Sequence, residues 1–428
     1  MIDALIIGGG VSGLEAALAL KQCGLSVRVL EASERLGGAV DTQCIDGFRC
    51  EVGASTLRAD GEILNARCQE FAIPLKPIGG DASRRKGILT DEGLIHVSGP
   101  GDVLRRSLLS WPAKIRLMLE PLRGSSANSD ETLHAFLCRR LGREAGEMFA
   151  PLMARGVYAS GSKDLLVRTA FPRLWSMDRD KGLLRSMAKA ARTGIVSLPE
   201  GLGQLADGYS RRLGTQVVCQ RAVQRLDQTD HGWIVETVDE SYQAKQIVLA
   251  VPAAVAARLI APTDQELSRL IAAIRRSELS NVQLGYRDID APRGFGFLVH
   301  PRAGGEMLGC VFASQLDPQC SPPNSALFSC MVGPSEDPVA SARQTLEQAL
   351  GLSIEPDMVH LTRYPHGLPI YDGEQDRLRQ EIEKRSEDVQ GLQLAGNYLR
   401  GISVESSLQS GRRAAELILK SHTTRQVA

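Results

Sequence analysis

The glycines near the start of the chain carry the clearest chemical signal in this sequence. The run Gly8-Gly9-Gly10-Val11-Ser12-Gly13 follows the apolar stretch 4–7 and precedes a stretch of helical character at 14–20. In a strand–turn–helix unit of this kind, Gly8 permits the tight turn, Gly10 lets backbone N–H groups approach a pyrophosphate, and Gly13 allows the helix to pack closely on the strand. We therefore expect this turn to bind a dinucleotide.

An acidic residue stands where such a dinucleotide site needs one. Glu31 follows the second apolar run, 26–30, eighteen residues after Gly13, and Ala32 comes next. A carboxylate at this position accepts hydrogen bonds from the ribose hydroxyls and disfavours a 2′-phosphate. A glycine turn alone is a weak signal, but strand, helix and acid occur here in register.

Three further glycine motifs lie in the first and last parts of the chain. Arg35-Leu-Gly37-Gly38 comes soon after Glu31, Glu51-Val-Gly53-Ala54 follows, and Leu394-Ala-Gly396-Asn397 precedes Gly401-Ile-Ser-Val404 and a helical stretch at 405–419. This arrangement resembles the FAD-binding group of amine oxidases, phytoene desaturases and porphyrinogen oxidases. The resemblance implies an FAD site whose pyrophosphate and flavin lie along these segments.

The resemblance also assigns the remaining cofactor contacts. They are Arg35, Gly38, Ala39, Gly53, Ala54, Ser55, Thr56, Val223, Gly396, Asn397, Ile402, Ser403 and Val404. The helix after Val404 is implied to direct its positive N-terminal end at the flavin, which stabilises the reduced anion. Asn397 stands where many relatives carry Asp, so it keeps a hydrogen-bonding group but no charge. Val223 is equally compatible with a plain strand core.

Landmarks spread over the chain narrow the resemblance. They are Arg155-Gly-Val-Tyr-Ala-Ser-Gly161, Ala170-Phe-Pro-Arg-Leu174, Gly294-Phe-Gly-Phe-Leu298, Leu308-Gly-Cys-Val-Phe-Ala-Ser314 and Tyr364-Pro-His-Gly-Leu-Pro369. In order and spacing they are similar to the oxygen-dependent protoporphyrinogen and coproporphyrinogen oxidases of haem biosynthesis. That family implies an O2-dependent, six-electron oxidation of a porphyrinogen with release of hydrogen peroxide.

The same resemblance implies a mainly apolar slot with a cationic edge, which suits a macrocycle with acidic arms. Its residues would be Arg85 or Lys86, which attract a propionate, with Gly156, Phe295, Gly296, Leu298 and Met331 as the lining. Plainer roles stay open for each of them. The basic run 84–86 is compatible with a solvated surface, Phe295 and Met331 with core packing, and the two glycines with turns.

The sequence offers no evident catalytic nucleophile or metal-ligand spacing among its nine cysteines and seven histidines. The implied chemistry belongs instead to the flavin N5 atom. One departure from the family pattern stands at Glu405-Ser406-Ser407, where relatives usually carry Asn-Asp-Cys or a close variant. It would add a carboxylate near the flavin end of the site.

Composition restricts the partners and the location. Lys plus Arg and Asp plus Glu are both 50, so no long-range field would gather nucleic acid. Scattered cysteines in odd number indicate reduced thiols and a cytoplasmic protein. No apolar run reaches the ~18–20 residues of a membrane span. The expected partners are therefore a porphyrinogen and O2; a contact with the neighbouring haem-pathway enzyme is a further hypothesis, and the oligomeric state stays open.

The segment from Leu104 to Leu122, with Arg123, mixes apolar and basic residues. Such a segment is suited to lie on an anionic membrane surface, and family members are often peripheral membrane proteins. Peripheral attachment to the inner face of the cell membrane is therefore a hypothesis. Packing of this segment on its own domain is the alternative.

The expected fold is α/β, with an α+β second domain. A Rossmann-like FAD-binding domain with a parallel sheet, discontinuous in sequence, is expected over 1–80, 195–258 and 385–420. A strand-rich substrate-binding domain is expected over 81–99 and 259–384, and a helical insert over 100–194.

Two other functions remain compatible with the cofactor motifs. The first is an amine oxidase or a carotenoid-type desaturase, and the second is a catalytically inactive flavin-binding protein that acts by interaction. Amine oxidases commonly set two aromatic rings beside the flavin, whereas this chain has an aromatic content of 4%. Tyr398 is a candidate for one such ring, and no obvious partner accompanies it.

Overall fold

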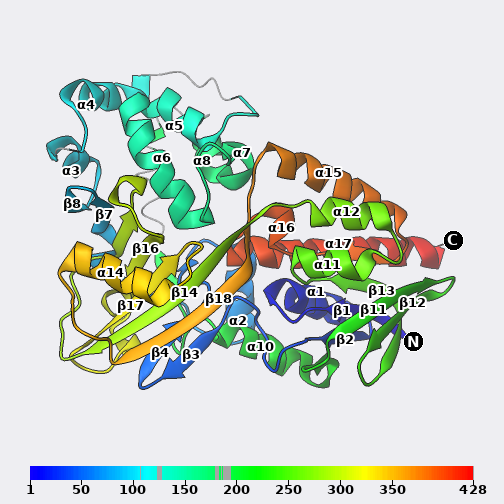
Figure 1. Ribbon diagram of the computed structural model, residues 1–428. Helices are drawn as coiled ribbons and strands as arrows, with labels where there is room; N and C mark the ends of the chain where they lie inside the picture. The colour runs from blue at the N-terminus through cyan, green and yellow to red at the C-terminus, as the bar shows by residue number, and fades with distance from the viewer. Residues whose placement is uncertain (107, 123–127, 179–182, 185, 187–193, 428) are drawn as a thin grey trace.

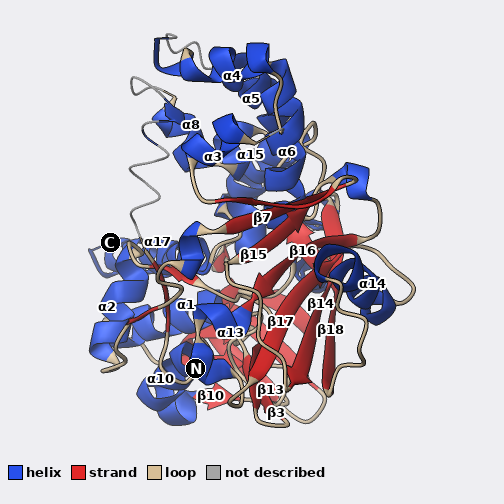
Figure 2. Ribbon diagram, turned by 90° about the vertical axis from the view of Figure 1, so that its left-hand side faces the viewer, coloured by secondary structure: helices blue, strands red, loops and turns tan. Residues whose placement is uncertain are grey.

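The computed structural model of the chain describes residues 1–106, 108–122, 128–178, 183–184, 186 and 194–427. Within these residues, two seven-stranded sheets form the body of the molecule, and a group of helices stands at the upper left of Figure 1. Figure 2 shows strands of the second sheet lying side by side, with this group of helices above them. The expected α/β class is confirmed.

The first sheet assembles strands from distant parts of the chain. Its order is β10-β2-β1-β13-β12-β11, with β19 beside β13. The parallel strands are β1 (Ile2–Ile7), β2 (Val27–Leu30), β10 (Val217–Val218), β13 (Ser241–Leu249) and β19 (Leu392–Leu394). The strands β11 (Val223–Thr229) and β12 (Gly232–Thr237) continue the sheet in antiparallel pairing. The expected parallel sheet, discontinuous in sequence, is confirmed.

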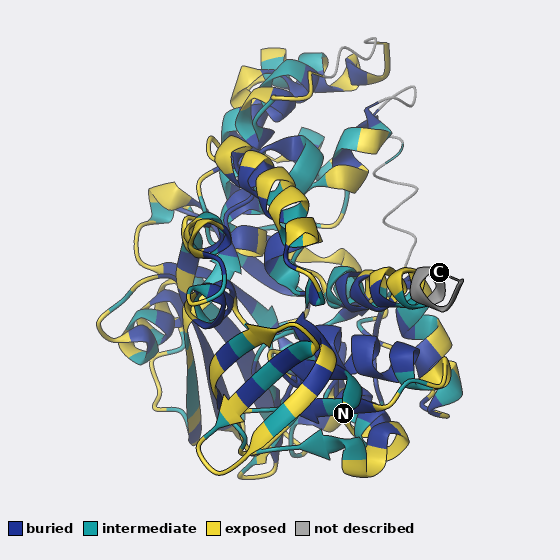
Figure 3. Ribbon diagram, turned by 90° about the vertical axis from the view of Figure 1, so that its right-hand side faces the viewer, coloured by how far each residue is buried: buried dark blue, intermediate teal, exposed yellow. Residues whose placement is uncertain are grey.

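Helices cover both faces of the first sheet, so its central strand β1 is buried and apolar, with Ala4, Leu5 and Ile6 fully buried. One apolar cluster takes in α1 (Val11–Gln22), α2 (Glu62–Glu70), α10 (Gln204–Leu213) and α17 (Val404–Val427). Another takes in α11 (Ala253–Ile260), α12 (Gln265–Ala272) and α15 (Gly373–Asp388). Figure 3 shows that exposed residues gather on the outer helices and on the antiparallel strands β11 and β12, while the strands behind them are buried.

The packing bears on the division into domains. Helices α12 and α15 share an apolar cluster with the strands of the first sheet, although the expected division placed residues 259–384 with the second domain. The division into three sets of ranges stays a prediction.

The second sheet has the order β18-β14-β17-β16-β15-β7-β8. Its strands are β7 (Lys86–Thr90), β8 (Gly93–Val97), β14 (Arg276–Arg287), β15 (Gly296–Val299), β16 (Met307–Phe312), β17 (Ser325–Val332) and β18 (Met358–Pro369). One face carries an apolar cluster with Phe297, Cys310 and Phe328, against which α14 (Pro338–Leu350) packs. The opposite face is therefore left to meet the first sheet's loops and the helical region.

A helical region lies within the range predicted for the insert, whose bounds stay a prediction. It contains α3 (Pro100–Arg105), α4 (Trp111–Met118), α5 (Leu133–Leu141), α6 (Arg143–Tyr158), α7 (Val167–Ala170) and α8 (Pro172–Met177). A buried ion cluster helps to hold it together, because Arg140 pairs with both Glu120 and Asp178. Arg123 lies outside the described residues. Within the described parts of the chain, none of the helices combines the length and apolar character needed to cross a membrane.

Candidate functional site

The glycine turn after β1 has the geometry that its sequence predicts. Gly8 has φ of +108°, and a side chain there would meet the carbonyl of Ala250. A Cβ at Gly13 would overlap the carbonyl oxygen of Gly8, so the close approach of α1 to β1 excludes any side chain. A Cβ at Gly10 would meet no atom within 4 Å. The turn therefore leaves open space beside Gly10, at the N-terminus of α1, where a pyrophosphate would bind.

The Arg35 motif lies directly against this turn. Gly37 N donates to Gly9 O at 2.9 Å, and a Cβ at Gly38 would lie 3.2 Å from the Cα of Gly10. The Arg35 guanidinium donates to Gly38 O at 3.1 Å, which closes the loop. The structure thus brings together two predicted contact segments from separate turns.

The third predicted segment continues this surface. Ala54 N donates to Ala39 O at 3.0 Å, and a side chain at Gly53 would overlap the same carbonyl oxygen. Ser55 and Thr56 follow before β5 (Leu57–Arg58). Residues 8–13, 35–39 and 53–56 therefore follow one another in space along the backbone. We call these segments, together with residues 396–404, the cradle, because all of them are predicted to contact FAD.

Glu31 ends β2 beside the glycine turn, and its carboxylate is partly engaged within the protein. Oε2 accepts from Gly9 N at 2.6 Å, and Oε1 accepts from Ser33 N at 2.8 Å. Oε1 also accepts from the Ser33 hydroxyl at 2.8 Å. These bonds fix the side chain next to the turn, and Oε2, which accepts from Gly9 N, keeps a second lone pair. The contact of Glu31 and Ala32 with a ribose stays a prediction.

Val223 lies at the start of β11 and is buried in the apolar cluster beneath the first sheet. Val223 therefore does pack in the apolar core. Arg221, two residues earlier, donates its N–H to Glu31 O at 2.8 Å. The backbone that leads into Val223 therefore lies near Glu31, where the ribose of the adenosine is predicted to bind. A backbone contact from Val223 to the cofactor stays a prediction.

The C-terminal part of the chain supplies the other end of the cradle. Gly396 N donates to Ser410 Oγ at 3.0 Å, and the carbonyl of Asn397 accepts from the Tyr371 hydroxyl at 2.5 Å. The Gly401 N–H donates to the same hydroxyl. Ile402 and Ser403 then lead into α17, whose first N–H groups include that of Ser406, donated to Ser403 Oγ at 3.0 Å.

The position of α17 relative to α1 sets the span of the cradle. A Cβ at Gly411 would overlap the carbonyl oxygen of Ser12, so the two helices touch at this level. Val404 lies seven residues earlier, which is about 10 Å along the helix axis. The N-terminus of α17 therefore lies about this far along the helix from its contact with the start of α1. The residues present fit FAD.

The carboxylate of Glu405 does not project freely into the cradle. It accepts hydrogen bonds from the N–H groups of Ile63 and Leu64, both at 3.0 Å. The family departure at this position therefore adds a contact to helix α2 rather than an unpaired charge near the flavin end.

The predicted substrate residues fall into two neighbouring groups on the second sheet. In the first group, Leu298, Gly309 and Met331 are cross-strand neighbours on one face. A Cβ at Gly156, on α6, would lie 2.5 Å from Cδ2 of Leu298. The structure thus brings Gly156, Leu298 and Met331 to one place, with Gly156 in contact with Leu298 and not merely in a turn.

The second group contains the basic residues. Lys86 pairs with Gly296 across β7 and β15, and its Nζ lies 6.0 Å from the centre of the Phe295 ring. Phe295 N donates to Arg85 O at 2.8 Å, and Phe295 is half-buried. Both basic side chains are exposed, so either is available to an acidic group at this edge of the sheet.

Buried polar residues on the same face were not expected from the sequence. Asn281, Gln283 and Ser329 are all buried. Gln283 Nε2 donates to Asn281 Oδ1 at 2.7 Å, to Ser329 Oγ at 2.9 Å and to Glu51 O at 2.8 Å. The alternation Asn281-Val-Gln283-Leu was the available signal, because it places two amides on one face of a strand whose other face is apolar.

A small cavity of about 40 Å³ adjoins these polar groups. Glu51, Ser55, Gln283 and Ser329 are among the residues that line it. Burial raises the pKa of Glu51 to about 7, although hydrogen bonds from Leu202 N and the Thr42 hydroxyl act in the opposite direction. The cavity joins the predicted cofactor segment at Ser55 to the second sheet.

A larger hollow of about 670 Å³ lies beside α6 and contains none of the predicted substrate residues. Arg155, Lys163, Glu147 and Glu306 are among its lining residues, so it carries charges of both signs. The predicted slot is therefore defined by the contact of Gly156 with Leu298 and does not coincide with this hollow.

Comparisons with known proteins agree with this geometry. A model of the family described as flavin containing amine oxidoreductase matches residues 11–419. The protoporphyrinogen oxidase of Bos taurus is 30% identical to this chain, with 97% of the chain and 98% of the relative covered.

Two solved structures show the same fold. One is a protein from Exiguobacterium sp. 255-15 with a provisional assignment as protoporphyrinogen oxidase; it superposes with a TM-score of 0.84 at 22% identity, covering 98% and 99% of the two chains. The other is the cyclohexylamine oxidase of Brevibacterium oxydans IH-35A, with a TM-score of 0.75, 17% identity and 99% coverage of both chains. The chain therefore belongs to the flavin-containing amine oxidoreductase family and, within it, is homologous over nearly its whole length to protoporphyrinogen oxidases.

Proposed function

We propose that this protein is an FAD-dependent oxidase that uses O2 to convert a porphyrinogen into a porphyrin. The substrate is protoporphyrinogen IX or coproporphyrinogen III, and the pathway is haem biosynthesis. The observation that carries the proposal is the contact of Gly156 with Leu298 in the row that includes Met331. This apolar row lies on a sheet whose face also meets the predicted cofactor segment, through Gln283 and Glu51.

The residues of the chain would bind and orient the substrate. Leu298, packed against the bare backbone of Gly156, and Met331 would offer an apolar surface to the macrocycle and would help to keep water from the reacting carbon. The exposed side chains of Arg85 and Lys86 would attract a propionate arm at its edge. Bound FAD supplies the redox chemistry, since it accepts hydride and passes electrons on to O2.

The reaction stoichiometry tests the proposal. Purified protein is mixed in air with each porphyrinogen, and porphyrin fluorescence and hydrogen peroxide are measured together. Because the oxidation removes six electrons, we expect three molecules of hydrogen peroxide for each porphyrin formed. Protein that holds FAD yet forms no porphyrin above the rate of spontaneous oxidation with either substrate would exclude this function.

An amine oxidase is the second candidate, because the family model and the fold of cyclohexylamine oxidase are shared. Its expected aromatic residue, Tyr398, is 1% exposed and packs in the apolar cluster beneath the first sheet. A ring in this position does not face a substrate. Tyr398 therefore gives this candidate no support, and turnover of simple amines would separate the two functions. A protein that holds FAD but oxidises neither porphyrinogens nor amines would support the third alternative, a catalytically inactive flavin-binding protein that acts by interaction.

We also propose that α4 attaches the protein to an anionic membrane surface. Trp111, Ile115 and Met118 follow one another along one side of this helix and are 75%, 55% and 64% exposed. Leu122, just beyond it, is 82% exposed. These side chains lie in solvent and are not packed on their own domain, which supports interfacial binding.

A further inference from the structure

Glu405 makes a contact that joins two distant helices. It lies in the first turn of α17, and its two carboxylate oxygens accept hydrogen bonds from Ile63 N and Leu64 N at 3.0 Å each. These N–H groups belong to the first turn of α2, whose N-cap residue, Gly61, has no side chain to cap it. Glu405 thus does from a separate helix what an N-cap side chain normally does within one.

The surroundings of this contact are closely packed. A Cβ at Gly61 would lie 2.7 Å from Oε2 of Glu405, so the absence of a side chain at position 61 lets the carboxylate reach the helix. Val404 and Leu408 of α17 belong to the same apolar cluster as Leu64 of α2. The negative charge also lies at the positive end of the α2 dipole. The contact is therefore part of a built interface.

The two helices carry the two sides of the predicted flavin end. Residues 53–56, which are predicted to contact the flavin, lie in the segment that leads into α2, and this segment ends at Gly61, the N-cap residue of α2. Residues 402–404, which are predicted to contact it from the other side, lead into α17. The early segment is fixed at its start by Ala54 N on Ala39 O and in its middle by the pairing of β5 with β9 (Ile195–Ser197). Glu405 fixes its far end to α17.

We propose that Glu405 is a positioning residue for the flavin. By tying α2 to the N-terminus of α17, it holds the segment 53–61 against the helix that completes the cofactor site. The inference rests on the FAD binding that is part of the proposed function, and it is independent of which substrate is oxidised.

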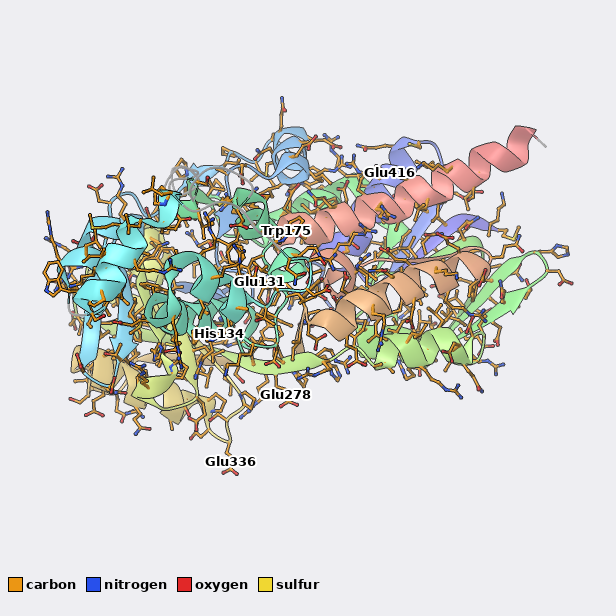
Figure 4. All side chains as sticks on the ribbon, turned by 90° about the horizontal axis from the view of Figure 1, so that it is seen from above. Glu131, His134, Trp175, Glu278, Glu336 and Glu416 are labelled. Atoms are coloured by element: carbon orange, nitrogen blue, oxygen red, sulfur yellow. The ribbon has the colours of Figure 1, made fainter. Side chains whose placement is uncertain are left out.

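The release of FAD from the holoenzyme tests this role. FAD fluorescence is followed after dilution of wild-type protein, Glu405→Ala and a control, Glu416→Ala. Glu416 lies on the same helix, where Figure 4 labels it, and is exposed. We expect about tenfold faster release from Glu405→Ala, which corresponds to about 1.4 kcal/mol, and wild-type release from the control. Equal release from the two variants would overturn the proposal.

A second variant separates positioning from simple helix capping. In the double variant Glu405→Ala/Gly61→Asp, the new side chain at the N-cap of α2 can accept from the same two N–H groups. The backbone at position 61, with φ of −70° and ψ of 119°, suits an Asp. Once Glu405 is shortened, the closest remaining neighbour of the new Cβ is Leu64 Cβ at 3.2 Å, which must shift by a few tenths of an ångström. Glu405→Ala alone is expected to lower the Tm, because α2 loses its cap. We expect the added Gly61→Asp change to restore the Tm but to leave FAD release fast, because α2 is capped again and still not tied to α17.

The release rate of the double variant decides between the two roles. If release returns to the wild-type rate, capping of α2 is the whole effect and positioning is excluded. If Glu405→Ala does not fold, Glu405→Gln, which keeps one acceptor oxygen, takes its place with an intermediate release rate expected. Wild-type protein that binds no FAD at all would instead contradict the proposed function.

Discussion

At the scale of single residues, the site is shaped as much by missing side chains as by present ones. Gly10 leaves open space at the N-terminus of α1, while Gly156 lets Leu298 lie directly against α6. A glycine at each position provides room that another residue would occupy. Substitutions there test the predicted site without removing any functional group.

Gly156→Ala is expected to narrow the predicted substrate slot. The new Cβ would lie 2.5 Å from Cδ2 of Leu298, so the flexible Leu298 side chain must turn away and intrude on the space for the macrocycle. We expect a KM for porphyrinogen several times higher and a nearly unchanged Tm. Gly101→Ala is the matched control, because a Cβ there meets nothing within 4 Å. Equal KM values for the two variants would argue against a slot at this position.

The basic residues at the edge of the sheet make a separate prediction. If Lys86 or Arg85 attracts a propionate, Lys86→Gln or Arg85→Gln raises the KM by roughly tenfold, since hydrogen bonds to charged groups contribute about 1.5–3 kcal/mol. Arg84→Gln is the control, because Arg84 is exposed and lies 3.8 Å from Asp81. The substrate is titrated at low and high salt. If none of the three substitutions changes the KM, neither Arg85 nor Lys86 attracts a propionate of the substrate.

Glu51 makes the stability of the protein depend on pH in a predictable direction. Burial raises its pKa from 4.5 to about 7, so between these values the folded state binds more protons than the unfolded state does. The stabilisation is therefore complete below pH 4.5 and is lost as the pH rises through about 7.

We expect the Tm of wild-type protein to fall more between about pH 5 and about pH 8 than that of Glu51→Gln. The uncharged amide keeps the shape and an acceptor oxygen but does not titrate. Glu416→Gln, at an exposed position, is expected to follow the wild type. A Glu51→Gln profile parallel to that of the wild type would show that Glu51 does not ionise in this range.

At the scale of helices and strands, local patterns predicted what local chemistry determines. The turn at Gly8 and the start of α1 follow from backbone sterics and from apolar runs only a few residues long, so the sequence alone predicts them. The contact of Gly156 with Leu298 depends on how α6 packs on β15, and no local pattern encodes that. The family resemblance supplied those residues instead.

Glu405 shows the same limit more clearly. The sequence placed an additional carboxylate near the flavin end, and the structure turns it onto α2, across a separation of 342 residues from Ile63. A cap supplied by a different helix leaves no signature near α2 except a glycine at its N-cap. The cluster of Asn281, Gln283 and Ser329 was missed for a similar reason, because its hydrogen bonds join different strands.

Helix α4 carries the prediction about membranes. Trp111→Ser/Ile115→Ser removes two apolar side chains that are 75% and 55% exposed, so little stability should be lost. Co-sedimentation with vesicles that contain phosphatidylglycerol is expected to fall several-fold. Val238→Ser is the control, because Val238 is 77% exposed on the hairpin of the first sheet. Unchanged co-sedimentation of the double variant would exclude α4 as the attachment site.

At the scale of the whole molecule, the predicted cofactor site takes residues from both ends of the chain. The glycine turn comes from the first residues, and the helix that is predicted to complete the site comes from the last. The second sheet, which carries the predicted slot, is inserted between them in sequence. The residues predicted to bind FAD and those predicted to bind the substrate therefore come from different sheets, and the hydrogen bond from Gln283 Nε2 to Glu51 O joins the second sheet to the segment that leads to Gly53.

Anaerobic mixing of the purified holoenzyme with protoporphyrinogen IX and, separately, with coproporphyrinogen III tests whether this flavin oxidises a porphyrinogen. Loss of the oxidised flavin absorbance is recorded first, and porphyrin fluorescence is recorded after air is admitted. We predict rapid bleaching by one of the two substrates, followed by reoxidation and porphyrin formation in air, which would also identify the substrate. A flavin that both porphyrinogens leave oxidised, and that an amine or a carotenoid precursor reduces, would exclude porphyrinogen oxidation as the function of this protein.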